Sequence, residues 1–139
     1  MGKEIIFRGK SINDNGWIEG YYVGNNTIVK TEDMMYNLGY IDDSRCYECH
    51  PESIGQFTGR KDVNGKNIYE GDVICGNFPY ASKCLVEWDG NRCCFYLKPI
   101  DGIKKAGCDI GYKMNSAKVN IIGNIWDNKD LIKNDDIIS

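Results

Sequence analysis

The chain has 139 residues and a mass of 15.8 kDa, about the size of one domain, which excludes a large multidomain enzyme. Its 17 basic and 20 acidic residues leave a net charge of −3, so no overall positive charge attracts nucleic acid, and such a role needs a local basic patch. With 42% hydrophobic and 27% charged residues, the composition is that of a folded protein rather than a disordered one.

Cellular location and cysteine chemistry follow from the same composition. The chain opens without a secretory leader, and no stretch approaches the ~20 apolar residues of a membrane span, so we expect a cytoplasmic protein without membrane contact. Its seven cysteines are an odd number. We therefore expect reduced thiols that pack as small hydrophobic groups, rather than a disulfide framework.

The first elements in the chain are short β-branched and aromatic runs. Residues 4–12 and 17–23 flank Asp14-Asn15-Gly16, in which asparagine and glycine tolerate positive φ, and this arrangement predicts a hairpin. Residues 27–30 predict a third strand. Residues 31–39 begin with a threonine suited to an N-cap and end with glycine, which predicts a short helix.

Two short elements precede the middle of the chain. Residues 45–50 predict a strand that ends before Pro51, and residues 51–54 predict a single helical turn with that proline at its start. The segment that follows, up to residue 71, is rich in glycine and aspartate, and we interpret it as a series of turns.

The second half has the pattern of a small β-barrel. Asp89-Gly90 predicts a tight turn between two antiparallel strands, and residues 98–118 predict a long loop that carries at most an irregular strand. Residues 127–133 predict a closing helical turn. The strands predicted around these features cover residues 72–75, 84–88, 92–97 and 119–126.

Aromatic residues in this half have two interpretations. Alternation along residues 84–88 places Cys84, Val86 and Trp88 on one face, so we predict that Trp88 belongs to the core. The alternative is a stacking platform for single-stranded nucleic acid. The residues in question are Tyr21, Tyr22, Phe78, Tyr80, Trp88, Phe95, Tyr96 and Trp126.

One short motif contains metal-binding residue types. Cys46-Tyr47-Glu48-Cys49-His50 matches the C-x-x-C-H pattern of covalent haem attachment, but that chemistry requires export and a further axial ligand. Zinc is the better alternative, with Cys46, Cys49 and His50 as candidate ligands and Cys93, Cys94 or Cys108 as a fourth. Adjacent residues of a strand point to opposite faces, so only one of Cys93 and Cys94 serves. We predict no metal and no cofactor.

The sequence contains few residues that could form a catalytic nucleophile and base pair. His50 is the only histidine, so a nucleophile and base pair would have to be built around that residue. We therefore predict that the protein is not an enzyme and has no catalytic residue.

The central run from Pro51 to Ile74 closely resembles the signature of the YopX-like family of bacteriophage and prophage proteins. Flanking segments agree with it: residues 7–10 with 15–21, and residues 121–128. The resemblance implies a mainly β fold with an SH3-like barrel in the C-terminal half, a phage or prophage origin, and no established biochemical function. It divides one domain, residues 1–139, into an N-terminal β subdomain (1–50) with a hairpin and a short helix, a signature linker (51–71) and the barrel (72–139).

We expect a phage accessory protein that binds a host or phage protein. Exposed β edges also allow the protein to associate with a second copy of itself. The alternative is a nucleic-acid-binding module that uses the barrel aromatics and basic residues, among them Lys104 and Lys105. The candidate binding residues are Phe57, Arg60, Lys61, Lys66 and Arg92.

Overall fold

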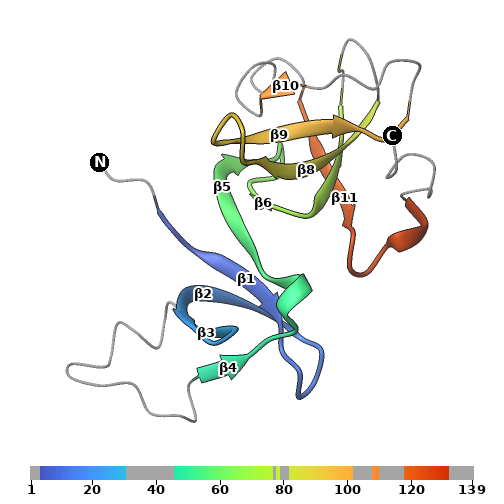
Figure 1. Cartoon of the computed structure of the whole chain (residues 1–139). Helices are drawn as coiled ribbons and strands as arrows, with labels where there is room; N and C mark the ends of the chain where they lie inside the picture. Colours follow the sequence, from blue (N-terminus) through green and yellow to red (C-terminus); the bar gives the residue numbers. More distant parts are fainter. Residues whose placement is uncertain are drawn as a thin grey trace. The chain divides into compact units, whose positions relative to one another are not determined.

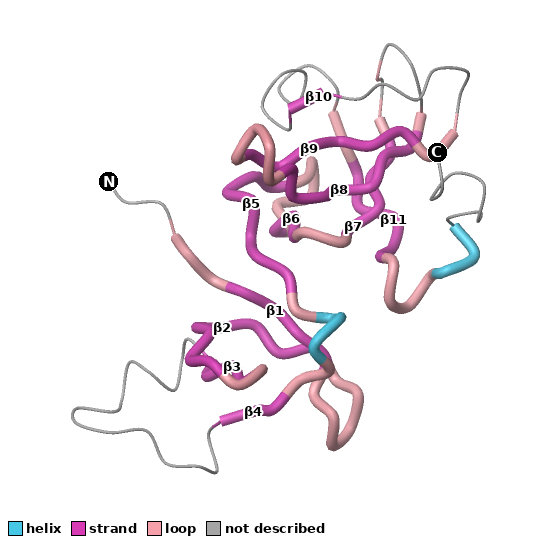
Figure 2. The backbone as a smooth tube through the Cα atoms, in the orientation of Figure 1, coloured by secondary structure: helices cyan, strands magenta, loops and turns pink. Residues whose placement is uncertain are grey.

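The computed structural model describes residues 4–30, 46–76, 78, 82–101, 108–109 and 118–131. The chain divides into two compact units, Met1–Gly59 and Arg60–Ser139. The described ranges are built from antiparallel strands and short 3₁₀ helices (Figure 1, Figure 2), which confirms the predicted mainly β class. Within these ranges, no helix has the length and apolar character needed to cross a membrane.

The five strands that begin in the first unit form most of a six-stranded antiparallel sheet. Neighbouring strands follow the order β4-β3-β2-β1-β5, and β6 (Asn67–Tyr69) extends the sheet beyond β5. The 3₁₀ helix η2 (Pro51–Ser53) lies between β4 and β5, where a helical turn is predicted. The strands are β1 (Phe7–Lys10), β2 (Trp17–Gly24), β3 (Thr27–Lys30), β4 (Cys46–Glu48) and β5 (Gly55–Lys61).

Local turn chemistry explains the hairpins of this unit. Asp14 accepts the Gly16 amide through Oδ1 at 2.9 Å, and Asn15 adopts a φ of 58°. In the β2–β3 turn, Asn25 and Asn26 adopt φ values of 53° and 57°, the two successive positive angles of a type I′ turn. The predicted hairpin and third strand are therefore confirmed. The predicted helix over residues 31–39 lies outside the described residues.

The core of the first unit lies between strands β1, β2 and β3 and the segment that follows β4. Gly9 makes room for a thiol there, because a Cβ at that position would lie 2.8 Å from the Cβ of Cys49. The Ser53 hydroxyl accepts the Lys10 amide at 2.8 Å and so attaches η2 to β1. The buried residues are Ile18, Ile28 and Cys49, with Phe7, Tyr47 and Ile54 packed around them.

The second unit contains an antiparallel sheet of order β10-β9-β8-β7-β11. A 3₁₀ helix, η3 (Lys129–Leu131), follows the last strand, within the range predicted as a helical turn. The strands are β7 (Asp72–Cys75), β8 (Lys83–Asp89), β9 (Cys94–Pro99), β10 (Cys108–Asp109) and β11 (Asn120–Asn124). The buried core consists of Ile68, Ile74, Phe78, Cys84, Val86, Leu97 and Val119.

Most strand boundaries in this unit agree with the sequence pattern, and β9 shows why one does not. The strand was expected from residue 92, but it begins at Cys94. Asp89 Oδ1 accepts the amides of Asn91 and Arg92 at 3.0 and 3.3 Å, and Cys93 adopts a φ of 56°. The turn therefore extends through Cys93. The predicted irregular strand within residues 98–118 is the two-residue β10.

The glycine-rich middle contains strands as well as turns. Gly59, Gly65 and Gly71 adopt φ values of 90°, 81° and 94°, which glycine accommodates without the cost that a Cβ adds. Between these glycines run the end of β5 and all of β6, which the prediction of consecutive turns missed. The boundary between the two units falls after Gly59, inside the run expected to be a linker.

The prediction that Trp88 belongs to the core is wrong. Cys84 and Val86 on the same face of β8 are buried, whereas Trp88 is 49% exposed. Trp88 pairs with Phe95 one position from the end of the β8–β9 ladder, and its ring packs edge-on against the Phe95 ring. Alternation correctly predicts which face a side chain takes, but β8 extends beyond the buried cluster.

Candidate binding surfaces

The three zinc candidates have other contacts in the first unit. Cys49 is 1% exposed, and its thiol donates to the Tyr47 carbonyl at 3.5 Å. His50 Nε2 lies 3.0 Å from Asn15 Oδ1, and Cys46 is half-buried on β4. Over the residues that the structure describes, no group of three or more histidine, cysteine, aspartate or glutamate side chains is arranged to hold a metal ion.

The other cysteines considered for that site belong to the second unit. Cys93 lies in the β8–β9 turn and not in β9, so strand alternation does not apply to the pair Cys93 and Cys94. The side chain of Cys108 lies outside the described part.

Thiol reactivity should differ strongly between these cysteines. Burial, together with the nearby charge of Glu48, raises the pKa of Cys49 to about 11, so this thiol stays protonated at neutral pH. Cys93 is exposed. We expect iodoacetamide at about pH 8 to label Cys93 first, and Cys49 and Cys84 only after denaturation. Peptide mass spectrometry of a labelling time course measures this, and early labelling of Cys49 would contradict its burial.

Asp62 organises the β5–β6 hairpin, the centre of the sequence signature. Its Oδ1 accepts the amides of Asn64 and Lys66, each at 2.9 Å, and its Oδ2 accepts the amide of Ile121 at 3.2 Å. Burial raises the pKa of Asp62, but these amides and the charge of Lys66 outweigh burial and hold the pKa below its ordinary value. The carboxylate therefore joins the hairpin to β11.

Asp72 has a comparable structural role at the next turn. It is 1% exposed, and its Oδ2 accepts the Tyr69 amide at 2.8 Å. Both buried acids of the signature thus bond backbone amides at glycine turns. The two carboxylates therefore stabilise turns of this segment.

The five candidate binding residues lie on β5, on the β5–β6 hairpin and on the β8–β9 turn, and they differ in burial. Phe57 is 4% exposed and serves as a packing residue, and Arg60 is half-buried. Lys61 and Lys66 are exposed on the β5–β6 hairpin. Arg92 is exposed on the β8–β9 turn, where its Nε lies 3.7 Å from Asp89 Oδ2 and its guanidinium lies 6.0 Å from the Tyr96 ring centroid. Lys104 and Lys105 lie outside the described residues.

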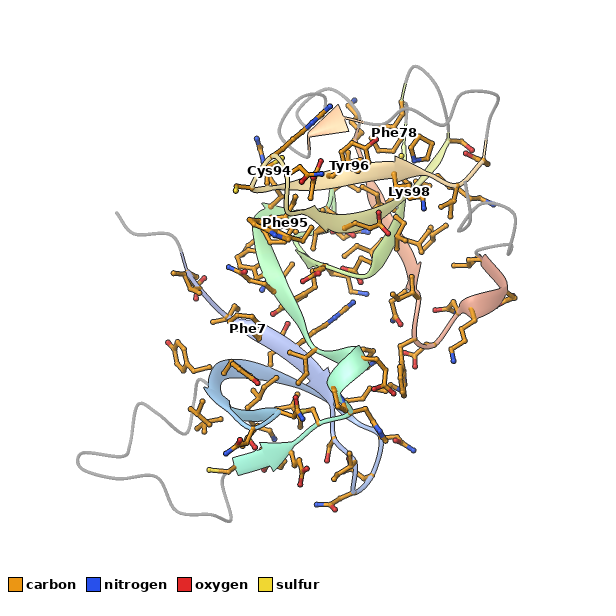
Figure 3. All side chains as sticks on the ribbon, in the orientation of Figure 1. Phe7, Phe78, Cys94, Phe95, Tyr96 and Lys98 are labelled. Atoms are coloured by element: carbon orange, nitrogen blue, oxygen red, sulfur yellow. The ribbon has the colours of Figure 1, made fainter. Side chains whose placement is uncertain are left out.

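The tip of the β8–β9 hairpin presents an aromatic surface that includes Trp88 and Phe95, two of the aromatic residues considered from the sequence. The Trp88 and Phe95 ring centroids lie 5.1 Å apart with an interplanar angle of 73°. Phe95 is 7% exposed and continues into the core, so it supports a neighbour that is half exposed. Figure 3 shows Phe95 between Cys94 and Tyr96 on β9. Tryptophan is enriched among the residues that dominate binding surfaces.

A second aromatic cluster lies on the first unit. The Arg8 guanidinium lies 4.6 Å from the Trp17 ring centroid, and the Lys10 ammonium lies 5.4 Å from it. Both cations project from β1, whose Lys10 is paired with Trp17 of β2. These contacts occupy the ring with the protein's own cations, so Trp17 is a weaker candidate for a partner than Trp88.

Comparison with known proteins identifies the family. The model of the family described as YopX protein matches residues 6–133, which include every described strand. No curated protein matches the chain. Because the family match spans nearly the whole sequence and contains the Asp62 hairpin at its centre, the chain belongs to the YopX protein family.

Proposed function

We propose that this protein is a non-enzymatic binding module that docks a protein partner through the tip of the β8–β9 hairpin. The observation that carries this proposal is the half-exposed Trp88, supported edge-on by Phe95. Tryptophan is strongly enriched among the few residues that dominate protein interfaces. The partner is a protein of the phage or of its bacterial host, met in the cytoplasm.

Covering Trp88 would contribute free energy to an interface with a protein partner. A tryptophan side chain exposes up to about 250 Å², so covering the exposed half removes on the order of 100 Å² from water. At about 25 cal/mol per Å², that burial contributes roughly 2–3 kcal/mol to an interface. The Phe95 ring also packs against the indole before binding, and such preorganisation lowers the entropy that a complex must lose.

We propose that the second unit is an SH3-like barrel that positions this hairpin. Supporting this, β11 pairs with β7 and is also bonded to the β5–β6 turn. The Val63 amide donates to the Val119 carbonyl at 3.0 Å, and the Ile121 amide donates to Asp62. These bonds link the first and last segments of the unit, and this linkage is the support for the proposed barrel.

The structural roles of the acids support a non-enzymatic protein. Asp62 and Asp72 accept backbone amides, and Asp101 accepts the amides of Ser82 and Lys83, each at 2.9 Å. Carboxylates engaged in this way stabilise turns and are poorly placed to exchange protons with a substrate. Binding without chemistry is therefore the proposed activity.

Trp88→Ala tests the docking surface. We expect the variant to lose at least about tenfold in partner affinity while it keeps the wild-type circular dichroism spectrum, because the removed ring is largely outside the core. Tyr21→Ala removes an aromatic ring of similar exposure, 40%, from the first unit and serves as the matched control. Both variants and the wild type are used as bait in infected-cell lysate, and recovered proteins are quantified by mass spectrometry.

The same experiment separates the alternatives. A protein recovered by the wild type and by Tyr21→Ala but not by Trp88→Ala supports the proposal. Equal recovery by all three baits overturns it. Recovery of a differently tagged second copy of this chain, lost with Trp88→Ala, identifies the partner as the protein itself.

A further inference from the structure

Backbone hydrogen bonds of the second unit bring together the segments that carry three exposed lysines. Lys61 and Lys66 flank the β5–β6 turn, where the Asp62 amide donates to the Lys66 carbonyl at 2.8 Å. Lys118 immediately precedes Val119, whose carbonyl accepts the Val63 amide at 3.0 Å. The hydrogen bonds thus bring a segment from the end of the chain against the hairpin. We call Lys61, Lys66 and Lys118 the lysine cluster.

The only acid within residues 60–67 and 118–121 does not offset these charges at the surface. Asp62 is 7% exposed, and backbone amides occupy both of its carboxylate oxygens. Its charge is directed into the joint between the hairpin and β11. The exposed part of this surface therefore carries the three ammonium groups, although the whole chain has a net charge of −3.

The remaining exposed groups of this surface are mostly polar. Asn64 is exposed, and its Nδ2 donates to Asn120 Oδ1 at 3.3 Å, across the same junction. Val63, at 55% exposed, is the only large apolar side chain that the hairpin turn presents. Protein interfaces are depleted of lysine and need an apolar centre, whereas phosphate contacts use lysine and asparagine side chains.

We propose that the lysine cluster binds the phosphate backbone of nucleic acid, without reading its sequence. This surface is separate in kind from the Trp88 surface, because it acts through charge rather than through apolar burial. Three contacts with phosphates displace about three counterions, so affinity should fall roughly 20- to 40-fold between about 50 and about 200 mM salt.

The test uses the whole chain and a fluorescein-labelled DNA duplex in fluorescence anisotropy. The test variant combines Lys61→Gln, Lys66→Gln and Lys118→Asn. Asparagine is chosen at position 118 because Lys118 has a φ of 50°, which asparagine tolerates best among non-glycine residues. The control variant combines Lys83→Gln, Lys98→Gln and Lys129→Gln, which removes the same charge from other parts of the second unit.

We expect the test variant to lose at least about tenfold in DNA affinity and most of its salt dependence, while the control keeps wild-type values within about threefold. Equal losses in the two variants would show that only net charge matters and would overturn the proposal. Polyglutamate of matched charge serves as a competitor. If it displaces the duplex as well as unlabelled DNA does, the surface recognises acidic protein instead, and the assignment to nucleic acid is wrong.

Discussion

Replacing Gly20 by alanine is expected to destabilise the first unit by roughly 3–5 kcal/mol, the largest effect of any single methyl group considered for this protein. Gly20 pairs with Lys30 in the β2–β3 ladder. An added Cβ would overlap the carbonyl oxygen of Val29 and would lie 2.8 Å from the Cα of Lys30. Both atoms belong to the backbone of β3, so no side-chain rotation relieves the overlap.

The expected consequence is separation of β3 from β2 and loss of the core between them. Ile28, on β3, is fully buried in that core, so its packing depends on the position of the strand. Urea unfolding followed by circular dichroism measures the loss. Gly90→Ala is the control, since a Cβ there would meet nothing closer than 4.0 Å. A Gly20→Ala variant within about 1 kcal/mol of wild type would contradict the close approach of the two strands.

Asp62→Asn is expected to cost about 2–4 kcal/mol, because it disturbs charged hydrogen bonds to three backbone amides. If the amide oxygen keeps the bonds to Asn64 and Lys66, its NH₂ group faces the Ile121 amide, and two donors oppose each other. The hairpin then loses its attachment to β11. Asn64→Ala, which removes only the bond between side chains on this junction, should cost less than about 1 kcal/mol.

The effect of Asp62 should depend on pH with a definite sign. Burial raises its pKa, but the amide bonds and Lys66 lower it further, so the folded pKa lies below the ordinary value of 3.8. Stability from this group is therefore fully present above that value and is lost as the pH falls through the folded pKa. The difference in unfolding free energy between wild type and Asp62→Asn should shrink as the solution is acidified below pH 3.8.

The contribution of Asp101 to the pH dependence of stability must be distinguished from that of Asp62. Its burial raises the pKa, and the Ser82 hydroxyl, the amides of Lys83 and Ser82, and the charge of Lys83 together bring the pKa below the ordinary value. It loses stabilising charge in the same acidic range, but it is present in both proteins. Subtracting the two titrations therefore isolates Asp62. A difference that stays constant with pH would contradict the charged carboxylate at the hairpin.

Local turn chemistry made much of the fold predictable. The aspartates of Asp14-Asn15-Gly16 and Asp89-Gly90 bond backbone amides two residues further along the chain. Their hairpins were therefore identified without any knowledge of the tertiary structure. The strand at Asp72–Cys75 was predicted to the residue. The family signature likewise lies in a continuous run, and the match over residues 6–133 confirms the resemblance.

The candidate binding surfaces were less predictable because they depend on neighbours far along the chain. Alternation placed Trp88 on the core face, but only the position of the buried cluster decides that the ring is 49% exposed. Lys118 was absent from the predicted binding residues, because it reaches Lys61 and Lys66 through a bond between Val63 and Val119. Cys49 was a candidate metal ligand in the sequence, whereas in the structure its thiol is buried beside Gly9 in the core of the first unit.

By itself, the sequence determined the mainly β class, the hairpin turns, the glycine conformations and the family, because each rests on residues adjacent in the chain. The tertiary structure alone decided which aromatic ring is left outside the core, which charges share a surface, and that Asp62 joins the β5–β6 hairpin to β11. Exposure and charge proximity are properties of packed segments. They arise only when residues separated by tens of positions, such as Asp62 and Ile121, are brought into contact.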